Sequence, residues 1–260
     1  MCGIFGVYGN DDAAAMAHLG LYSLQHRGQE SSGIVAVDPE LGAKAVKRMG
    51  LVSEAFAIPE VQSLRGNIAI GHTRYSTAGS STIENAQPVL VRFRDGHIAL
   101  AHNGNLTNAT ELRRDLENEG SIFMSTMDSE VLVHRMAHSS SVKPEDRLAD
   151  ALRGVEGAYC LVVIVGNTLL AARDPRGWRP LVMGKLGDAT VFASESCALD
   201  LLGATLEREV ECGEIIAVDA NGTRSMFPLE KKESRKCVFE YVYFSRPDSQ
   251  VFGGSVDRAR

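Results

Sequence analysis

The chain has 260 residues, of which 44% are hydrophobic and 23% are charged, a composition typical of globular proteins. This length can bury a sizeable core in one large domain. The net charge of −6 argues against a nucleic-acid binder, which would need a basic face. The sequence has no apolar run long enough to span a membrane and no signal-peptide pattern at its start. These features predict a cytoplasmic protein that contacts neither membranes nor nucleic acid.

Strand-like and helix-like patterns mix along the chain. In order, the predicted elements are strand Gly3–Tyr8, helix Asp11–His26 stopped by Gly28, strands Gly33–Asp38, Asn67–Gly71, Val89–Phe93 and His97–His102, a helix from Asn108 to Gly120, helices Asp128–His138 and Pro144–Arg153, and strands Gly157–Gly166, Thr168–Arg173, Leu181–Gly187, Thr190–Ala193, Glu214–Asp219 and Thr223–Phe227. Asn108 with Glu111 resembles a capping box. Turn pairs such as Asp95-Gly96 and Asn221-Gly222 favour antiparallel hairpins. The mixture predicts an α+β fold with two antiparallel sheets packed face to face and helices outside.

The C-terminal part changes character. Residues from Pro228 to Arg235 are polar and charged, which indicates a connector. A strand-like segment, Cys237–Phe244, and a Gly-Gly-containing tail follow, and together they are too short to form a domain. We therefore predict one domain over residues 1–235, and in residues 236–260 a connector with the start of a further domain that the chain does not include.

Five cysteines occur, at positions 2, 160, 197, 212 and 237. Their odd number, wide spacing and lack of a CxxC pair indicate neither a disulfide framework nor a self-contained zinc site. Cys160 lies in an apolar strand pattern and is interpreted as a small core residue, as are Cys197 and Cys212.

Cys2 has chemistry that the other cysteines lack. Met1 is followed by a small residue, so removal of the initiator methionine would leave a free α-amine on the residue that carries the thiol. An α-amine has an ordinary pKa of about 7.8, against about 10.4 for lysine, so it is a base near neutral pH. One residue thus supplies both a nucleophile and its base. The alternative is that position 2 holds a chance residue ahead of the first strand.

Four polar clusters favour the nucleophile. They lie at the ends of predicted elements, where site residues are usually presented, and they span Gln25–Gly33, His72–Gly79, His102–Leu106 and Ser125–Glu130. Together they provide a cation, amide donors and a carboxylate, the groups needed to hold a zwitterionic amino acid. The apolar strand after Cys2 would also keep the terminus from fraying.

These motifs identify a family. The chain resembles class II glutamine amidotransferases, and more narrowly the N-terminal half of glutamine phosphoribosylpyrophosphate amidotransferases. The resemblance rests on Cys2-Gly3-Ile4, His26-Arg27-Gly28, His72–Gly79, the run from His102 to Asn108, Asp128-Ser129-Glu130, Arg173–Gly177, Arg179-Pro180-Leu181, Ala193–Ser196 and Cys237–Ser249. It implies an N-terminal-nucleophile hydrolase fold, a four-layer αββα sandwich, and hydrolysis of glutamine to glutamate and ammonia through a thioester on Cys2.

The resemblance also implies the roles of single residues. Arg74 would pair with the α-carboxylate of glutamine, Asp128 would bind its α-ammonium group, and Thr77 would help to position it. The side-chain amide of Asn103 and the backbone N–H of Gly104 would form the oxyanion hole. The segment Arg74–Pro88 has no clear strand or helix pattern and is expected to act as a lid.

Partners and cofactors follow from the same resemblance. The ammonia would serve synthesis of 5-phosphoribosylamine from phosphoribosylpyrophosphate, in purine biosynthesis, on a phosphoribosyltransferase domain. The full-length protein is expected to be a homo-oligomer. No cofactor is expected for this chain, whereas the longer protein is expected to use Mg²⁺. In some family members a cysteine at the position of Cys237 ligates a [4Fe–4S] cluster whose other ligands lie in the absent domain.

Two alternatives stay open at this point. The chain could be the glutaminase half of an aminosugar or asparagine synthetase, although the Arg173–Gly177 and Cys237–Ser249 motifs argue against this. It could also be a catalytically silent module that senses glutamine. The presence of all the reacting groups argues against the second alternative.

Overall fold

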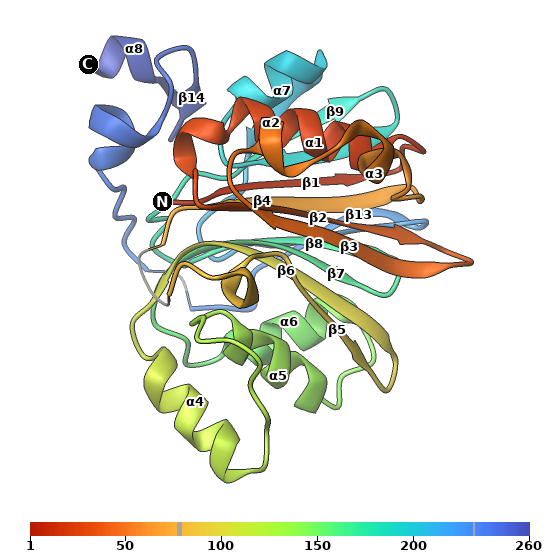
Figure 1. Ribbon diagram of the computed structural model, residues 1–260. Coiled ribbons are helices and arrows are strands. Elements are labelled where there is room, and N and C mark those ends of the chain that lie inside the picture. Colours follow the sequence, from red (N-terminus) through yellow and green to blue (C-terminus); the bar gives the residue numbers. More distant parts are fainter. Residues whose placement is uncertain (77–79, 231) are drawn as a thin grey trace.

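The computed structural model describes residues 1–76, 80–230 and 232–260, and these form four layers, with two antiparallel sheets between two layers of helices (Figure 1). The first sheet has seven strands, in the order β11 (Thr205–Glu209), β9 (Val182–Leu186), β10 (Ala189–Ala193), β1 (Gly3–Tyr8), β4 (Ile68–Arg74), β2 (Ser31–Asp38) and β3 (Gly42–Met49). The second has six strands, in the order β13 (Gly222–Met226), β12 (Ile215–Asp219), β8 (Thr168–Arg173), β7 (Gly157–Val165), β6 (Gly96–Leu106) and β5 (Val89–Phe93). The predicted αββα fold is confirmed.

Helices close both outer faces. The seven-stranded sheet is covered by α1 (Ala13–Ser23), α2 (Val52–Ala55), α3 (Ile58–Gln62) and α7 (Cys197–Leu202), and the six-stranded sheet by α4 (Ala109–Asn118), α5 (Glu130–His138) and α6 (Pro144–Leu152). Shorter elements are the 3-10 turns η1 (Gln25–Arg27) and η2 (Ile83–Asn85), the π-helical turn η3 (Glu240–Phe244), the hairpin β14 (Gln250–Val251) with β15 (Gly254–Ser255), and α8 (Val256–Ala259). No helix among the described residues is both long and apolar enough to cross a bilayer.

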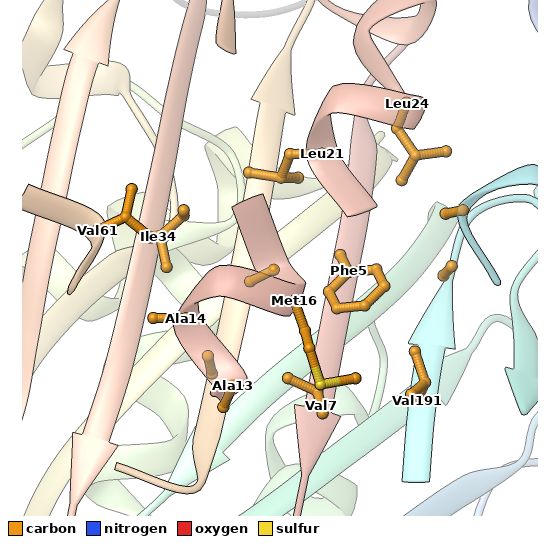
Figure 2. Close-up of a cluster of buried hydrophobic side chains, with 14 of the residues drawn as sticks. Phe5, Val7, Ala13, Ala14, Met16, Leu21, Leu24, Ile34, Val61 and Val191 are labelled. Atoms are coloured by element: carbon orange, nitrogen blue, oxygen red, sulfur yellow. The ribbon is translucent and has the colours of Figure 1, made fainter. Parts of the chain in front are cut away.

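Three hydrophobic clusters hold the layers together. Met16, Leu21 and Leu24 of the α1 region pack on Phe5 and Val7 of β1 in the cluster beneath α1 (Figure 2). A second cluster lies under α4, α5 and α6, and a third fills the space between the sheets. Burial of apolar side chains contributes about 25 cal/mol per Å² removed from water, so these clusters supply most of the driving force for folding.

A glycine in β1 allows a close approach between the two sheets. A Cβ on Gly6 of β1 would lie 2.4 Å from a methyl group of Val162 in β7. No larger residue fits there without moving a strand. β1 therefore lies tightly between the second sheet and α1, and the N-terminus of the chain lies at one edge of the sandwich (Figure 1).

Several local predictions differ from the structure. The capping box at α4 is wrong, because the side chain of Asn108 instead donates to the carbonyl oxygen of Gly154 at 2.8 Å and accepts from the N–H of Glu156 at 3.0 Å. The strand predicted over Cys237–Phe244 is also wrong. This segment coils into η3, which directs the carboxylate of Glu240 inward to Arg27.

Candidate active site

Cys2 lies just ahead of β1, which pairs with β10 on one side and β4 on the other. Three groups from other parts of the chain hold this residue. Its backbone N–H donates to Oδ1 of Asn103 at 3.2 Å, and its carbonyl oxygen accepts from Nε of Arg27 at 3.0 Å. Its thiol donates to the carbonyl oxygen of Tyr75 at 3.7 Å. The nucleophile predicted from the sequence is thus fixed at its amide, its carbonyl and its sulfur.

Burial and nearby charges have opposite effects on the pKa of the Cys2 thiol. Burial raises the pKa of the thiol, and the positive charges of the chain's α-amine, Arg74 and Arg27 counteract part of that rise. Burial lowers the pKa of the Met1 α-amine; the Cys2 thiolate opposes this, while Arg27 and Arg179 add to it. This end of the chain therefore favours a neutral amine, the form that can accept a proton.

Asn103 and Gly104 lie within β6, the long strand of the second sheet. Asn103 is fully buried, and its Nδ2 has no hydrogen-bond partner within the described residues. Buried donors are nearly always paired, so an unpaired one beside a nucleophile indicates a donor kept for a ligand. A Cβ on Gly104 would lie 2.0 Å from the carbonyl oxygen of Ala158, so only glycine fits at this position.

The residue before Asn103 is held by two side chains. Nε2 of His72 donates to the carbonyl oxygen of His102 at 3.1 Å, and Oε1 of Gln87 accepts from the N–H of His102 at 2.8 Å. Burial lowers the pKa of His72 to about 3, so this imidazole stays neutral at physiological pH. These contacts fix the backbone that carries the Asn103 amide.

Arg74 ends β4 and is almost fully buried. Its guanidinium donates to the carbonyl oxygen of Ser80 at 3.1 Å and lies 3.4 Å from Oε2 of Glu30. Oε1 of Glu30 accepts from the backbone and the hydroxyl of Ser76, at 2.9 and 2.7 Å. Glu30 therefore bridges Arg74 and Ser76, which both lie at the start of the segment predicted to act as a lid.

Asp128 lies just before α5 with both carboxylate oxygens engaged. Oδ2 accepts from the N–H of Leu106 and Oδ1 from the N–H of Ser129, each at 2.8 Å. Nδ1 of His102 is 3.7 Å from Oδ1. Burial alone would raise the pKa of Asp128, but His102 and the two backbone donors outweigh it and lower that pKa. A carboxylate has about four acceptor positions, so this one can still accept hydrogen bonds from an ammonium group.

Two further predicted residues receive no support from the structure. Thr77 lies outside the described residues, as does part of the Arg74–Pro88 segment. Cys237 is partly exposed, and its backbone N–H donates to the carbonyl oxygen of Trp178 at 3.3 Å. In the part of the chain that the structure describes, no three His, Cys, Asp or Glu side chains gather as a metal site. One cysteine cannot hold a four-ligand cluster, so iron–sulfur ligation by Cys237 and the use of Mg²⁺ stay predictions about a longer protein.

Three charged residues at the site received no role from the sequence. The side chains of Arg27, Glu195 and Glu240 are fully buried and form one cluster next to Cys2. Each lies in a motif that carried the family resemblance. Their pairing could not be read from the sequence, because Glu240 is far along the chain from Arg27 and a strand was predicted around it.

Comparison with known proteins shows the family to which the chain belongs. The profile of a glutamine amidotransferase domain family matches residues 72–201. Along its whole length the chain is 48% identical to "Amidophosphoribosyltransferase 2, chloroplastic" of Arabidopsis thaliana and 46% identical to the amidophosphoribosyltransferase of Bacillus subtilis. It spans 46% and 54% of those two proteins.

Solved structures give the same result. The glutamine phosphoribosylpyrophosphate amidotransferase of B. subtilis, complexed with ADP and GMP, matches 98% of this chain with a TM-score of 0.93 and 45% identity, over 55% of its own length. A class-II glutamine aminotransferase domain protein from Silicibacter pomeroyi shares the fold, with a TM-score of 0.56 at 16% identity over 88% of this chain and all of that one.

The chain therefore belongs to the glutamine amidotransferase domain family. Along its whole length the chain is similar to amidophosphoribosyltransferases, and it covers about half the length of those relatives. The family match and the similarity to amidophosphoribosyltransferases both agree with the resemblance found in the sequence. Similarity to these enzymes along the whole of this chain disfavours the alternatives of an aminosugar or asparagine synthetase.

Replacing Arg74 with lysine should raise the KM for glutamine by roughly 10- to 100-fold, because a point charge would replace a planar two-pronged donor at the substrate carboxylate. The turnover number should change far less, because the substrate α-carboxylate does not react. Steady-state kinetics of glutamate release will check this. A change confined to kcat would remove Arg74 from the substrate-binding role.

Proposed function

We propose that this chain hydrolyses glutamine to glutamate and ammonia, with Cys2 as an N-terminal nucleophile after loss of Met1. One observation carries the proposal. The amide of Asn103 contacts the backbone nitrogen of Cys2 through Oδ1, while its Nδ2 is buried without a partner among the described residues. One side chain thus contacts the nucleophilic residue and offers a donor beside it, and acyl transfer uses such a donor to stabilise the oxyanion.

In this mechanism the free α-amine of Cys2 takes the thiol proton, and the sulfur attacks the side-chain carbonyl carbon of glutamine. The resulting oxyanion accepts hydrogen bonds from Nδ2 of Asn103 and the N–H of Gly104. The C–N bond then breaks as the α-ammonium group of Cys2 returns its proton to the leaving nitrogen, giving ammonia and a γ-glutamyl thioester. The same amine next takes a proton from water as the water oxygen attacks the thioester. When the C–S bond breaks, the α-ammonium group returns that proton to the sulfur, which releases glutamate and regenerates the thiol.

Arg74 and Asp128 orient the substrate in this proposal. A guanidinium matches the α-carboxylate of glutamine, and the carboxylate of Asp128 matches its α-ammonium group. The two groups place the substrate side chain over Cys2, and neither takes part in proton transfer. The role of Thr77 in positioning glutamine and the closing of the Arg74–Pro88 segment stay predictions.

For the longer protein we propose that the ammonia reacts with phosphoribosylpyrophosphate to give 5-phosphoribosylamine for purine biosynthesis, on a phosphoribosyltransferase domain outside this chain. The whole of this chain is similar to about half of each amidophosphoribosyltransferase, and this similarity supports the proposal. A homo-oligomeric state also stays a prediction. So does a cytoplasmic location, because the similar proteins include plant enzymes named chloroplastic as well as bacterial ones.

Glutamate release by the 260-residue chain, with Met1 removed, will test the proposal. We expect equal amounts of glutamate and free ammonia, no hydrolysis by the Cys2→Ala variant, and a trapped γ-glutamyl adduct on Cys2 by mass spectrometry. Saturating phosphoribosylpyrophosphate should leave the rate unchanged. Absence of hydrolysis would favour a silent glutamine-sensing module, and several-fold stimulation would place an acceptor site within these residues.

A further inference from the structure

A buried ion cluster connects the nucleophile to the C-terminal segment, residues 237–256. Arg27 donates from its two terminal nitrogens to the two carboxylate oxygens of Glu240, both at 3.0 Å. It also donates to Glu195 at 2.5 Å. Its remaining nitrogen, Nε, donates to the carbonyl oxygen of Cys2. All three charged side chains have no exposed surface.

Both carboxylates also accept hydrogen bonds from groups in the C-terminal segment. Glu240 belongs to that segment and accepts from the hydroxyl of Ser245 at 3.1 Å. Glu195 accepts from the hydroxyl of Ser249 at 2.7 Å and from the N–H of Arg246 at 2.9 Å. Figure 1 shows this segment beside the N-terminus, although the two are at opposite ends of the chain.

Stability alone explains such a cluster poorly. The free energy lost when charges leave water offsets much of the free energy gained from their attraction. Proteins with apolar replacements of similar size are often as stable. Burial alone would raise the pKa of Glu195, but the charge of Arg27 and the hydrogen bond with His26 lower it to about 2. Glu195 thus stays ionised over the physiological range of pH, and the contacts of the cluster favour a role in orienting neighbouring groups.

The contact with Glu240 fixes the orientation of the Arg27 guanidinium. A guanidinium is planar, so two parallel bonds to one carboxylate define the plane in which its third nitrogen points. Here the bidentate contact with Glu240 aims Nε of Arg27 at the carbonyl of Cys2. We propose that Glu240 is a positioning residue for the nucleophile, which acts through Arg27 to hold the Cys2 carbonyl and makes residues 237–256 a working part of the glutaminase site.

This inference rests on the proposed function, and it places a required residue beyond the predicted domain boundary at residue 235. The Glu240→Gln variant should lose the paired contact with Arg27 and release the Cys2 carbonyl. We expect kcat for glutamine hydrolysis to fall roughly 10- to 100-fold, as for a misplaced reacting group, with KM changed less than about twofold.

A spectroscopic readout reports on the carbonyl itself. Labelling with ¹³C-carbonyl cysteine and ¹⁵N-glycine gives an HNCO peak only where glycine follows cysteine, which in this chain means Cys2-Gly3 and Cys212-Gly213. Loss of the donor from Arg27 should shift the Cys2 carbonyl upfield in Glu240→Gln, with the Cys212 peak as an internal reference. This measurement needs no activity, so it still tests Glu240 if the chain proves not to hydrolyse glutamine.

Glu214→Gln is the matched control. Glu214 is also buried and forms a bidentate pair, with Arg208 at 2.7 and 2.8 Å, but its contacts do not include Arg27 or Cys2. It should lower the melting temperature without moving the Cys2 carbonyl or kcat. If Glu240→Gln does not fold, Glu240→Asp keeps the charge and withdraws the carboxylate by one carbon, with a smaller shift in the same direction. An unmoved Cys2 carbonyl and unchanged kcat in a folded Glu240 variant would overturn the proposal.

Discussion

A chain that retains Met1 should hydrolyse glutamine roughly 10²- to 10⁴-fold more slowly than the chain that begins at Cys2, the range that general base catalysis contributes. With Met1 attached, the nitrogen of Cys2 is an amide that donates to Asn103 and has no basic electron pair. Met1 is also only 7% exposed, so it lies packed at the site. The retained residue both removes the base and occupies space beside the thiol.

The comparison needs two forms of one preparation. A leader that a site-specific protease removes immediately before Cys2 gives a blocked chain and a processed chain of otherwise identical sequence. Intact mass identifies each form, and glutamate release measures each rate. Full activity of the blocked form would exclude the α-amine as the base.

The processed form should also show the amine in its pH profile. The base must be neutral, so kcat/KM should rise with pH through the pKa of the Cys2 amine. Burial lowers the pKa of the Met1 amine at the same end of the chain. The Cys2 nitrogen is itself partly buried beside Asn103, so desolvation should place the midpoint of the acid limb below about 7.8, the ordinary value for an α-amine.

Removing the side-chain amide of Asn103 should lower kcat by about 10²- to 10³-fold, the usual cost of losing one oxyanion donor. The KM for glutamine should change little, because the oxyanion forms only in the transition state. Nδ2 of Asn103 has no partner in the described parts of the chain, so losing this nitrogen alone breaks no hydrogen bond among those residues.

Two variants separate the two ends of this amide. Asn103→Ala removes both the Nδ2 donor and the Oδ1 acceptor that holds the Cys2 nitrogen. Asn103→Asp keeps an acceptor and removes the donor. We expect both to lose kcat, measured on samples with matched thermal unfolding. Near-normal turnover by Asn103→Asp would assign the residue to anchoring Cys2 and leave the oxyanion to other donors.

The sequence was most informative where chemistry and pattern coincide. The strand pattern predicts a polar run at His102–Leu106, and the family resemblance assigns Asn103 and Gly104 within it to the site of Cys2. The structure places Oδ1 of Asn103 3.2 Å from the backbone nitrogen of Cys2. Periodicity did not reveal β3, an edge strand whose exposed Lys44 and Arg48 and whose small residues give weak alternation. Arg27 and Glu240 could not be paired in advance, because the sequence offers many charged residues and no rule for which of them meet inside a core.

The central place of β1 sets a time limit on the maturation of this protein. Met1 is only 7% exposed in the folded chain, where β1 lies between β4 and β10, so a peptidase would reach it more readily before these strands assemble. The last of these partners ends at residue 193, and synthesis at about 5–20 residues per second takes roughly 10 to 40 s to pass from residue 1 to that point. Removal of Met1 would thus compete with assembly of this sheet, and a chain that folds first would keep Met1 packed at the site.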